Sequence, residues 1–527
     1  MTIYDWIVIF IYLSIVVGIS YAIGKKQKNQ EDYYIAGKTL KYWQVGSSLV
    51  ANQVSAISLV GVPAFIAIKR GGGLKWLQYE FAVPLSMVVI ILVLIPVYRK
   101  KLKISIYEYL EQRFGSFSRS LLSFVFLISR SLASGVALLA TSYVTSVALN
   151  LDIKITIILI AFVSLLYTSI GGIKADIYSD IIQLIILWFS SIVSIYILLN
   201  LLGWNFSGIH SLLVDRLRVF YLSKTGLGDG ENFGFLPMLF GGLFLYISYY
   251  GCDQSQAQRL LSTKSDMETK KALVFNSFLR FPLVLTYSAV GLLFLLFLEK
   301  DSSFALKLSN LSPDYAMPVF FKTFLPAGVL GIVVSGIFAA SMSSLDSAIN
   351  SLSAATWEDF LIKLFPSLKR VEDRKKVFYS RFITVLWGVF TSVFALMIVN
   401  SSETVVEIVN KIGSAFYGPI AAFFFIGIFT KAEEFETLVG FTFAIAMNIF
   451  LWLKHPEISW LWWNPIGFFI PFLTVFIIVN VKKGKKRSLN FINISLNLRQ
   501  SYVLALILWF FLIVLVSFLI ESIFRVF

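Results

Sequence analysis

The chain has 527 residues, of which 57% are hydrophobic and only 14% are charged, and its mean hydropathy is +0.80. Soluble domains are about a quarter charged, so water is not the solvent for most of this surface. The formal charge of +15 lies in short Lys and Arg clusters between apolar runs. That pattern is typical of loops that orient a membrane protein and does not indicate nucleic-acid binding.

Apolar segments long enough to cross a bilayer follow one another along the whole chain. A spanning helix needs about 20 mostly apolar residues, and about fourteen segments meet that requirement. In chain order they cover 5–24, 42–68, 76–98, 119–149, 153–172, 178–202, 236–262, 272–299, 327–353, 377–400, 404–430, 434–453, 460–481 and 501–525. The pattern predicts one all-α integral membrane domain over residues 1–527.

The first span and the loop charges together predict the orientation. Asp5 stands at the start of the chain, and Lys25, Lys26 and Lys28 follow the first span, which indicates an uncleaved helix that starts outside. Alternate loops, beginning with 25–41, carry roughly 28 Lys and Arg, against roughly 12 in the other set. We expect a multi-pass protein of the plasma (inner) membrane with both termini outside. Short loops and the lack of long tails favour a bacterial membrane.

Two predicted spans are interrupted. Span 42–68 carries a polar stretch that a plain lipid-facing helix would not need, and span 236–262 contains the polar run Cys252-Asp253-Gln254. Irregular backbone at membrane depth is tolerated only where protein or a water-filled cavity surrounds it, and unwound carbonyls there can bind a small cation. The two spans are five apart in order, which is the spacing of an inverted repeat of five helices.

The segment GIFAASMSSLDS at 336–347 places four serines and an aspartate within one apolar span. Ser343 and Ser347 share a helix face one turn apart, and Ser344 lies one step round. Hydroxyl and carbonyl oxygens suit a sodium ion, although small residues at a tight helix contact would give the same serine pattern. Asp346 favours the ion site, because a carboxylate at mid-membrane costs roughly 2.5–3.5 kcal/mol and usually serves a function.

Further ionisable residues fall inside predicted spans: Glu80, Arg130, Asp180, Asp253 and Arg280. An interfacial position stays open for Glu80, and a capping role at an inner helix end stays open for Asp180. As a set, these residues indicate a polar bundle interior, which suits the pathway of a polar solute. Arg130 could also meet a substrate carboxylate.

Six short motifs occur in a characteristic order along the chain. They are SLVANQVSA at 48–56, ISIYEYLEQRFG at 104–115, GGIKADIYSDIIQ at 171–183, DQSQAQRLLSTKS at 253–265, ASMSSLDSAINS at 340–351 and GPIAAFFFIGIF at 418–429. Together they make the chain resemble the sodium:solute symporter family over about residues 5–480. In layout it is nearest to the sodium/sugar cotransporter branch.

The resemblance implies an amino-acid/sodium symporter-like core with broken second and seventh spans. The first repeat would cover 42–202 and the inverted second repeat 236–430. Segment 5–24 would be an extra first helix, and 434–527 would hold peripheral C-terminal helices.

The resemblance also implies where the coupling ion, Na+, binds. One site would use the carbonyls of Ala51, Val54 and Ala340 and the hydroxyls of Ser343 and Ser344. Some members have a second sodium site at the positions of Asp180, Asp346 and Ser347. A serine is expected where this chain has Asp346, and this departure puts the second site in question.

Solute positions are implied in the same way. Gln53 and Glu80 match polar contacts of the sugar branch, whereas Ser58, Asn410, Arg280 and Tyr246 keep a polar group but change its size. Tyr249 falls on the inner gate tyrosine. The pocket is therefore expected to be polar with an altered outline, and Arg130 leaves an acidic solute open.

We expect sodium-coupled symport of a small polar solute by alternating access. We expect the solute to be a sugar or polyol; an organic acid such as sialic acid or a monocarboxylate, and proton coupling through Asp346 or Asp180, stay open as alternatives. The single cysteine, the two distant histidines and the lack of a Ser-His-Asp set or glycine-rich phosphate loop argue against an enzyme or an ATP-driven pump. No pore-lining ring indicates a channel, and no obligatory protein partner is inferred.

Overall fold

The computed structural model describes residues 1–54, 56–69, 71–101, 104–205, 215–309, 311, 313–399, 405–483 and 500–526. Within these residues the chain is helical, and the only β contacts are two isolated bridges, Leu40–Thr263 and Leu227–Ile458. The predicted all-α class is therefore confirmed.

One set of helices, long or in consecutive pieces, follows the predicted apolar segments. They are α1 (Ile3–Gly24), α3 (Tyr42–Gln53), α4 (Ala56–Ala67), α5 (Ala82–Val89), α6 (Ile95–Lys101), α8 (Ser116–Leu149), α9 (Ile153–Leu202), α11 (Gly242–Cys252), α12 (Gln254–Leu261), α13 (Asp266–Lys300), α16 (Val329–Ala355), α18 (Asp373–Met397), α19 (Val405–Phe429), α20 (Glu434–Lys454), α21 (Trp463–Lys483) and α22 (Ser501–Val526). Shorter pieces include α2 (Gln30–Ile35), η1 (Ala36–Lys38), η2 (Leu74–Phe81), α7 (Glu108–Arg113), α14 (Ser302–Leu308), α15 (Ala316–Phe324) and α17 (Ile362–Leu364).

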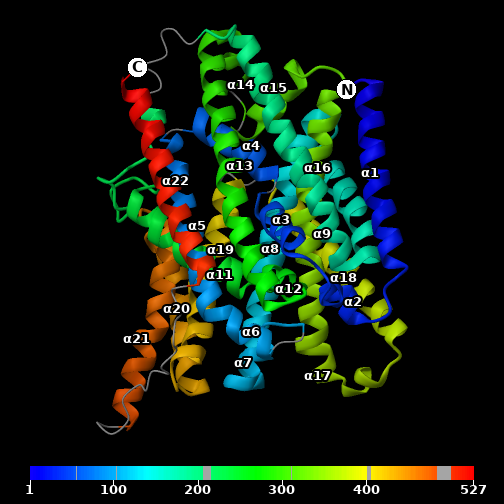
Figure 1. Cartoon of the computed structure of the whole chain (residues 1–527), viewed down its shortest axis with the longest axis vertical. Coiled ribbons are helices and arrows are strands. Elements are labelled where there is room, and N and C mark those ends of the chain that lie inside the picture. The colour runs from blue at the N-terminus through cyan, green and yellow to red at the C-terminus, as the bar shows by residue number, and fades with distance from the viewer. Residues whose placement is uncertain are drawn as a thin grey trace.

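The long helices stand side by side along the long axis of the molecule (Figure 1), with α1 on one flank and α21 and α22 on the other. α22 ends at the end of the bundle where α1 begins. α1 and α22 are the least buried of the membrane-spanning helices: 28% of the most apolar stretch of α1 and 22% of that of α22 are buried inside the protein, against 83% for α19. Exposed apolar side chains on the flanks, such as Phe10 and Phe511, suit contact with lipid.

In the described part of the chain, ten helices are long and apolar enough to cross a membrane, or eleven if α3 and α4 form one bent span. This supports a multi-pass membrane protein. The predicted spans 153–172 and 178–202 are arms of α9, and the predicted span 327–353 corresponds to α16 apart from its first two residues. The count of about fourteen spans and the inverted repeat stay predictions.

Both interruptions expected from the sequence are present as helix breaks. The helical pieces Tyr42–Gln53 and Ser58–Ala67 meet at an angle of 51°. α11 ends at Cys252, Asp253 is extended with φ −89° and ψ 128°, and α12 begins at Gln254. The breaks leave backbone groups without helical partners inside the bundle, where they can serve a bound solute or ion.

Gly172 divides α9 into its two arms. Its φ of 57° and ψ of −169° lie in a region that only glycine adopts readily. A Cβ at this position would also stand 2.6 Å from the carbonyl oxygen of Tyr33. The glycine thus lets the chain turn and lets the segment after α1 pack against the turn.

Candidate functional site

A cavity of about 180 Å³ lies beside the two helix breaks. Its walls come from α3, α4, η2, α8, α11, α13 and α19. The structure brings all of the predicted solute residues together here: Gln53, Ser58, Glu80, Arg130, Tyr246, Arg280 and Asn410, with the predicted gate residue Tyr249. These residues are scattered over most of the chain, so the tertiary fold is what makes them one site.

Glu80 and Arg280 form a buried ion pair in the cavity wall. The Arg280 Nε and Nη2 atoms donate to the two carboxylate oxygens of Glu80 at 2.5 and 2.8 Å. Arg280 also donates to the hydroxyls of Tyr246 at 2.8 Å and Tyr250 at 3.1 Å, and the Tyr250 hydroxyl donates to Gln53. The two charges offset each other, and the linked hydroxyl and amide groups hold the wall in one arrangement.

Arg130 of α8 is the second cation of the cavity, and its charge is less completely matched. Its nearest carboxylate is that of Asp253, 3.8 Å from Nη1. Its Nε has no hydrogen-bond partner in the described part of the chain. The guanidinium lies 5.8 Å from the ring centre of Tyr249. A guanidinium with donor capacity left over, at the wall of a cavity, can bind a planar anionic group in two-point fashion.

Tyr249 lies where the cavity meets the break in the seventh span. Its hydroxyl accepts a hydrogen bond from Gln256 of α12 at 2.7 Å, and its ring is 6.1 Å from that of Tyr417. Asp253 caps α12 by accepting from the Ser255 N–H at 2.8 Å. Movement at this break would therefore shift both Tyr249 and Asp253, the carboxylate partner of Arg130.

Three further aromatic residues of the wall were not predicted. Trp76, Tyr79 and Tyr417 line the cavity, and Tyr79 packs 4.8 Å from the ring of Tyr246. The sequence feature that could have indicated Trp76 and Tyr79 was the segment KWLQYEF at 75–81, where aromatic residues surround Glu80. Aromatic faces combined with polar groups suit a ring or a hydroxylated carbon chain.

The predicted sodium ligands Ala51 and Val54 lie at the end of α3. Both are buried, and Val54 leaves the helix with φ −85° and ψ 79°. The last turn of a helix has carbonyl groups without an intrahelical partner, and α16 packs against α3 and α4 beside this break. Ala340, Ser343 and Ser344 belong to α16, but their side chains lie outside the described residues.

At the predicted second sodium site, Asp180 and Ser347 both contact a residue that was not predicted, Arg259 of α12. Arg259 Nη2 lies 3.2 Å from Asp180 and also donates to Ser347, and Nε donates to Ser48 at 2.7 Å. Ser48 in turn donates to Asp180. Asp180 and Arg259 are both fully buried, as is Asp346 nearby in α16. The sequence feature that could have identified Arg259 as a site residue was its position in the DQSQAQR motif.

The sequence and the fold both match known transporters. A model of the sodium:solute symporter family matches residues 33–436. The sodium/sialic acid symporter of Proteus mirabilis (strain HI4320) is 27% identical over 449 residues, which are 84% of this chain and 88% of that protein. The sodium/glucose cotransporter of Vibrio parahaemolyticus is 27% identical over 483 residues, 85% of this chain and 84% of that protein. The similarity extends over most of each protein.

A solved structure shows the same fold. A Na+-coupled sialic acid symporter in a substrate-bound outward-open state matches with a TM-score of 0.81, covering 91% of this chain and 98% of that chain at 24% identity. These similar proteins are transporters and not enzymes. Because the family match covers most of the chain, this protein belongs to the sodium:solute symporter family, whose members couple solute transport to sodium.

Proposed function

We propose that this protein moves a small polar solute into the cell together with sodium by alternating access. The observation that supports this most is the polar cavity beside two helix breaks, next to the predicted sodium ligands Ala51 and Val54. Sodium binds between α3 and α16 and favours the outward-open state. The solute binds, the outer side closes, Tyr249 moves aside and both are released inward. One charge that crosses 100 mV contributes about 2.3 kcal/mol, enough for well over tenfold accumulation.

The solute that the cavity suits best is an organic acid that carries hydroxyl groups. Arg130 supports this choice, because its Nε has no hydrogen-bond partner among the described residues and its carboxylate partner stands 3.8 Å away. Gln53, Ser58 and Asn410 line the same cavity and can contact hydroxyls. Similarity to a sialic acid symporter agrees with this class. A neutral sugar or polyol is the second candidate, supported by the internally neutralised pair of Glu80 and Arg280.

A single coupling sodium is the stoichiometry that the contacts support. The guanidinium of Arg259 already contacts Asp180 and Ser347. A sodium ion at the same oxygens would meet a fixed positive charge at close range, in a region with little water to screen it. We therefore assign the coupling ion to the site at Ala51, Val54, Ala340, Ser343 and Ser344.

Uptake into proteoliposomes under a sodium gradient tests the solute class. We expect uptake of a sialic acid or a monocarboxylate, and glucose and a polyol serve as neutral comparisons. Arg130→Gln should raise the KM for the acid roughly 10- to 100-fold, because a hydrogen bond to a charged group contributes about 1.5–3 kcal/mol. Uptake of only the neutral solutes, unchanged by Arg130→Gln, would establish the second candidate instead.

Thermal unfolding in sodium against potassium tests the coupling ion without knowledge of the solute. Sodium at ten times its Kd should stabilise the protein by roughly 1.4 kcal/mol. Ser344→Ala should weaken this shift, whereas Ser335→Ala in the same helix should leave it intact. No sodium-specific shift, together with uptake that responds to a pH jump at constant sodium, would favour proton coupling.

A further inference from the structure

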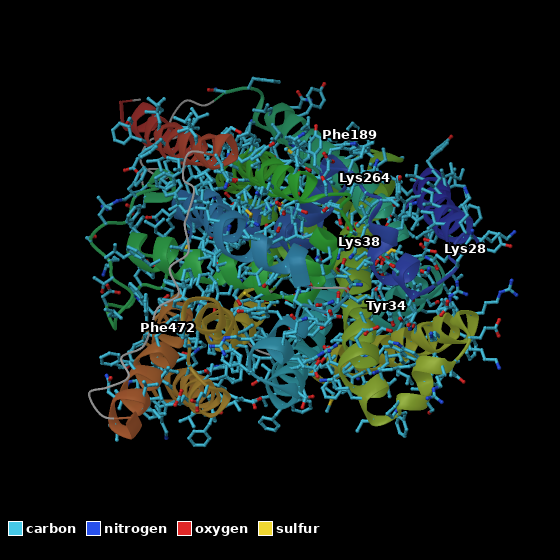
Figure 2. The ribbon with its side chains drawn as sticks, turned by 60° about the horizontal axis from the view of Figure 1, so that its bottom comes forward. Lys28, Tyr34, Lys38, Phe189, Lys264 and Phe472 are labelled. Carbon is cyan, nitrogen blue, oxygen red and sulfur yellow. The ribbon has the colours of Figure 1, made fainter. Side chains whose placement is uncertain are left out.

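A second cavity, of about 460 Å³, lies at the far end of α1, the end predicted to face the cytoplasm. It shares no residue with the solute cavity. Its walls come from the end of α1, the segment that follows α1, and α9 just beyond its turn at Gly172. Figure 2 brings this end of the molecule forward, with Lys28 and Lys38 labelled on the segment after α1.

The polar wall of this cavity has an excess of positive charge. Lys26 and Lys174 line it, and neither ammonium group has an ion-pair or hydrogen-bond partner in the described part of the chain. The one carboxylate of the wall, Asp32, accepts from the backbone N–H of Lys28 at 3.0 Å. Tyr178 also lines the cavity, and its hydroxyl accepts from Gln44 at 2.8 Å, which leaves its own O–H free to donate. The donors suit a phosphate group.

Another part of the lining is apolar and belongs to α1, a helix on the flank of the bundle. Ile19 and Ile23 of α1 line the cavity, and Ile15, one turn before Ile19 on the same face of the helix, is about half exposed, at 48%. Because α1 is one of the least buried spans, this wall leads directly to the membrane. A ligand with an anionic head and apolar chains fits both walls, whereas a free phosphate compound would leave the apolar wall unused.

We propose that this cavity binds the headgroup of an anionic phospholipid from the inner leaflet. The phosphate lies between Lys26, Lys174 and Tyr178, and the acyl chains follow the face of α1 that carries Ile19 and Ile23. The bound lipid adds a contact between α1 and α9, two helices that already pack directly against each other beside the cavity, where Gly24 lies close to Ile170. The inference does not depend on which solute the protein carries.

Lipid titration of the purified full-length protein in detergent tests the site. Native mass spectrometry would compare binding of dioleoyl phosphatidylglycerol with that of dioleoyl phosphatidylcholine, which has the same acyl chains and no net charge. The wild-type protein should prefer the anionic lipid. Lys26→Gln and Lys174→Gln should each weaken that preference about fivefold, and the double variant roughly 25-fold, because each basic residue near an anionic headgroup contributes about 1 kcal/mol.

Lys25 and Lys28 provide the matched control. They belong to the same basic cluster but do not line the cavity, and Lys25 lies 4.5 Å from the ring centre of Tyr21. Lys25→Gln/Lys28→Gln removes the same charge and should keep the preference, as should Lys26→Arg/Lys174→Arg. Equal loss in both glutamine double variants, or no lipid preference in the wild type, would overturn the proposal.

Competition with glycerol phosphate distinguishes a lipid ligand from a soluble phosphate ligand. At matched phosphate concentration it should neither displace the anionic lipid nor raise the Tm, because it cannot use the apolar wall. Displacement of the lipid by glycerol phosphate would assign the cavity to a soluble phosphate compound and overturn the lipid assignment. If the glutamine double variant does not fold, the two single variants carry the test, since each has its own expected fivefold loss.

Discussion

Glu80 and Arg280 lie 200 residues apart in the chain and meet at 2.5 Å in the cavity wall. Glu80→Gln should lower the free energy of unfolding by about 3–5 kcal/mol, because it leaves a buried guanidinium without its counter-charge. Thermal and denaturant unfolding of the purified protein would measure the loss. Glu80→Gln/Arg280→Met should recover most of the lost stability, whereas solute uptake should be lost in both variants, because both change the lining of the solute cavity. An equally stable Glu80→Gln variant would contradict the pairing.

Arg259 gives a prediction about ion number. Arg259→Gln removes the fixed positive charge beside Asp180 and Ser347, so a cation at these oxygens is no longer repelled. The Hill coefficient for sodium binding should then rise from about 1 toward 2, the number of sites. Sodium titrations followed by Tm would measure it, and Arg259→Gln/Asp180→Asn should return the coefficient to about 1. A wild-type coefficient that already approaches 2 would reject the single-sodium assignment.

The break between α11 and α12 depends on Asp253, which caps α12 and pairs with Arg130. Asp253→Asn keeps the cap and removes the charge, whereas Asp253→Ala removes both. The alanine variant should therefore unfold more readily than the asparagine variant by about 1 kcal/mol, the usual contribution of an N-cap. Unfolding midpoints of the two variants, compared directly, test this. Identical midpoints would show that the cap does not stabilise the break.

The turn in α9 depends on Gly172. Gly172→Ala should destabilise the protein by about 1–3 kcal/mol, because alanine adopts this backbone conformation at a cost and its Cβ would stand 2.6 Å from the carbonyl oxygen of Tyr33. Gly18→Ala in α1 is the matched control, since its Cβ would meet nothing within 4 Å. If both variants unfold at the same temperature, the turn is not held by this glycine.

At the scale of the whole molecule, the orientation in the membrane is open to a labelling test. The one cysteine, Cys252, is buried and free, so the background should be low. An impermeant maleimide should label Thr2→Cys in intact cells, and it should label Lys369→Cys only after the membrane is permeabilised, because basic loops stay on the cytoplasmic side. The opposite pattern would invert the predicted topology. Cys252→Ser provides the unlabelled control.

The helices themselves were largely predictable from hydropathy. Each predicted span coincides with helix in the described residues, and the interruptions after α3 and at Asp253 were expected from the polar residues around them. Less predictable was α9, where two predicted spans belong to one helix divided at Gly172. Hydropathy summed over a segment shows that the segment is apolar. It does not show whether the chain turns at a glycine such as Gly172, or in which direction.

The sequence by itself determined that this protein belongs in a lipid bilayer, that it is helical and which family it resembles. Each of these rests on residue types and their spacing along the chain. Through that resemblance it also named the predicted solute residues, from Gln53 to Asn410, which line one cavity. Only the tertiary structure decided that Arg280 pairs with Glu80, that Arg259 contacts Asp180, and that Lys26 and Lys174 share a cavity. The physical reason is that ionic contacts depend on distance through space, which the packing of separate helices sets.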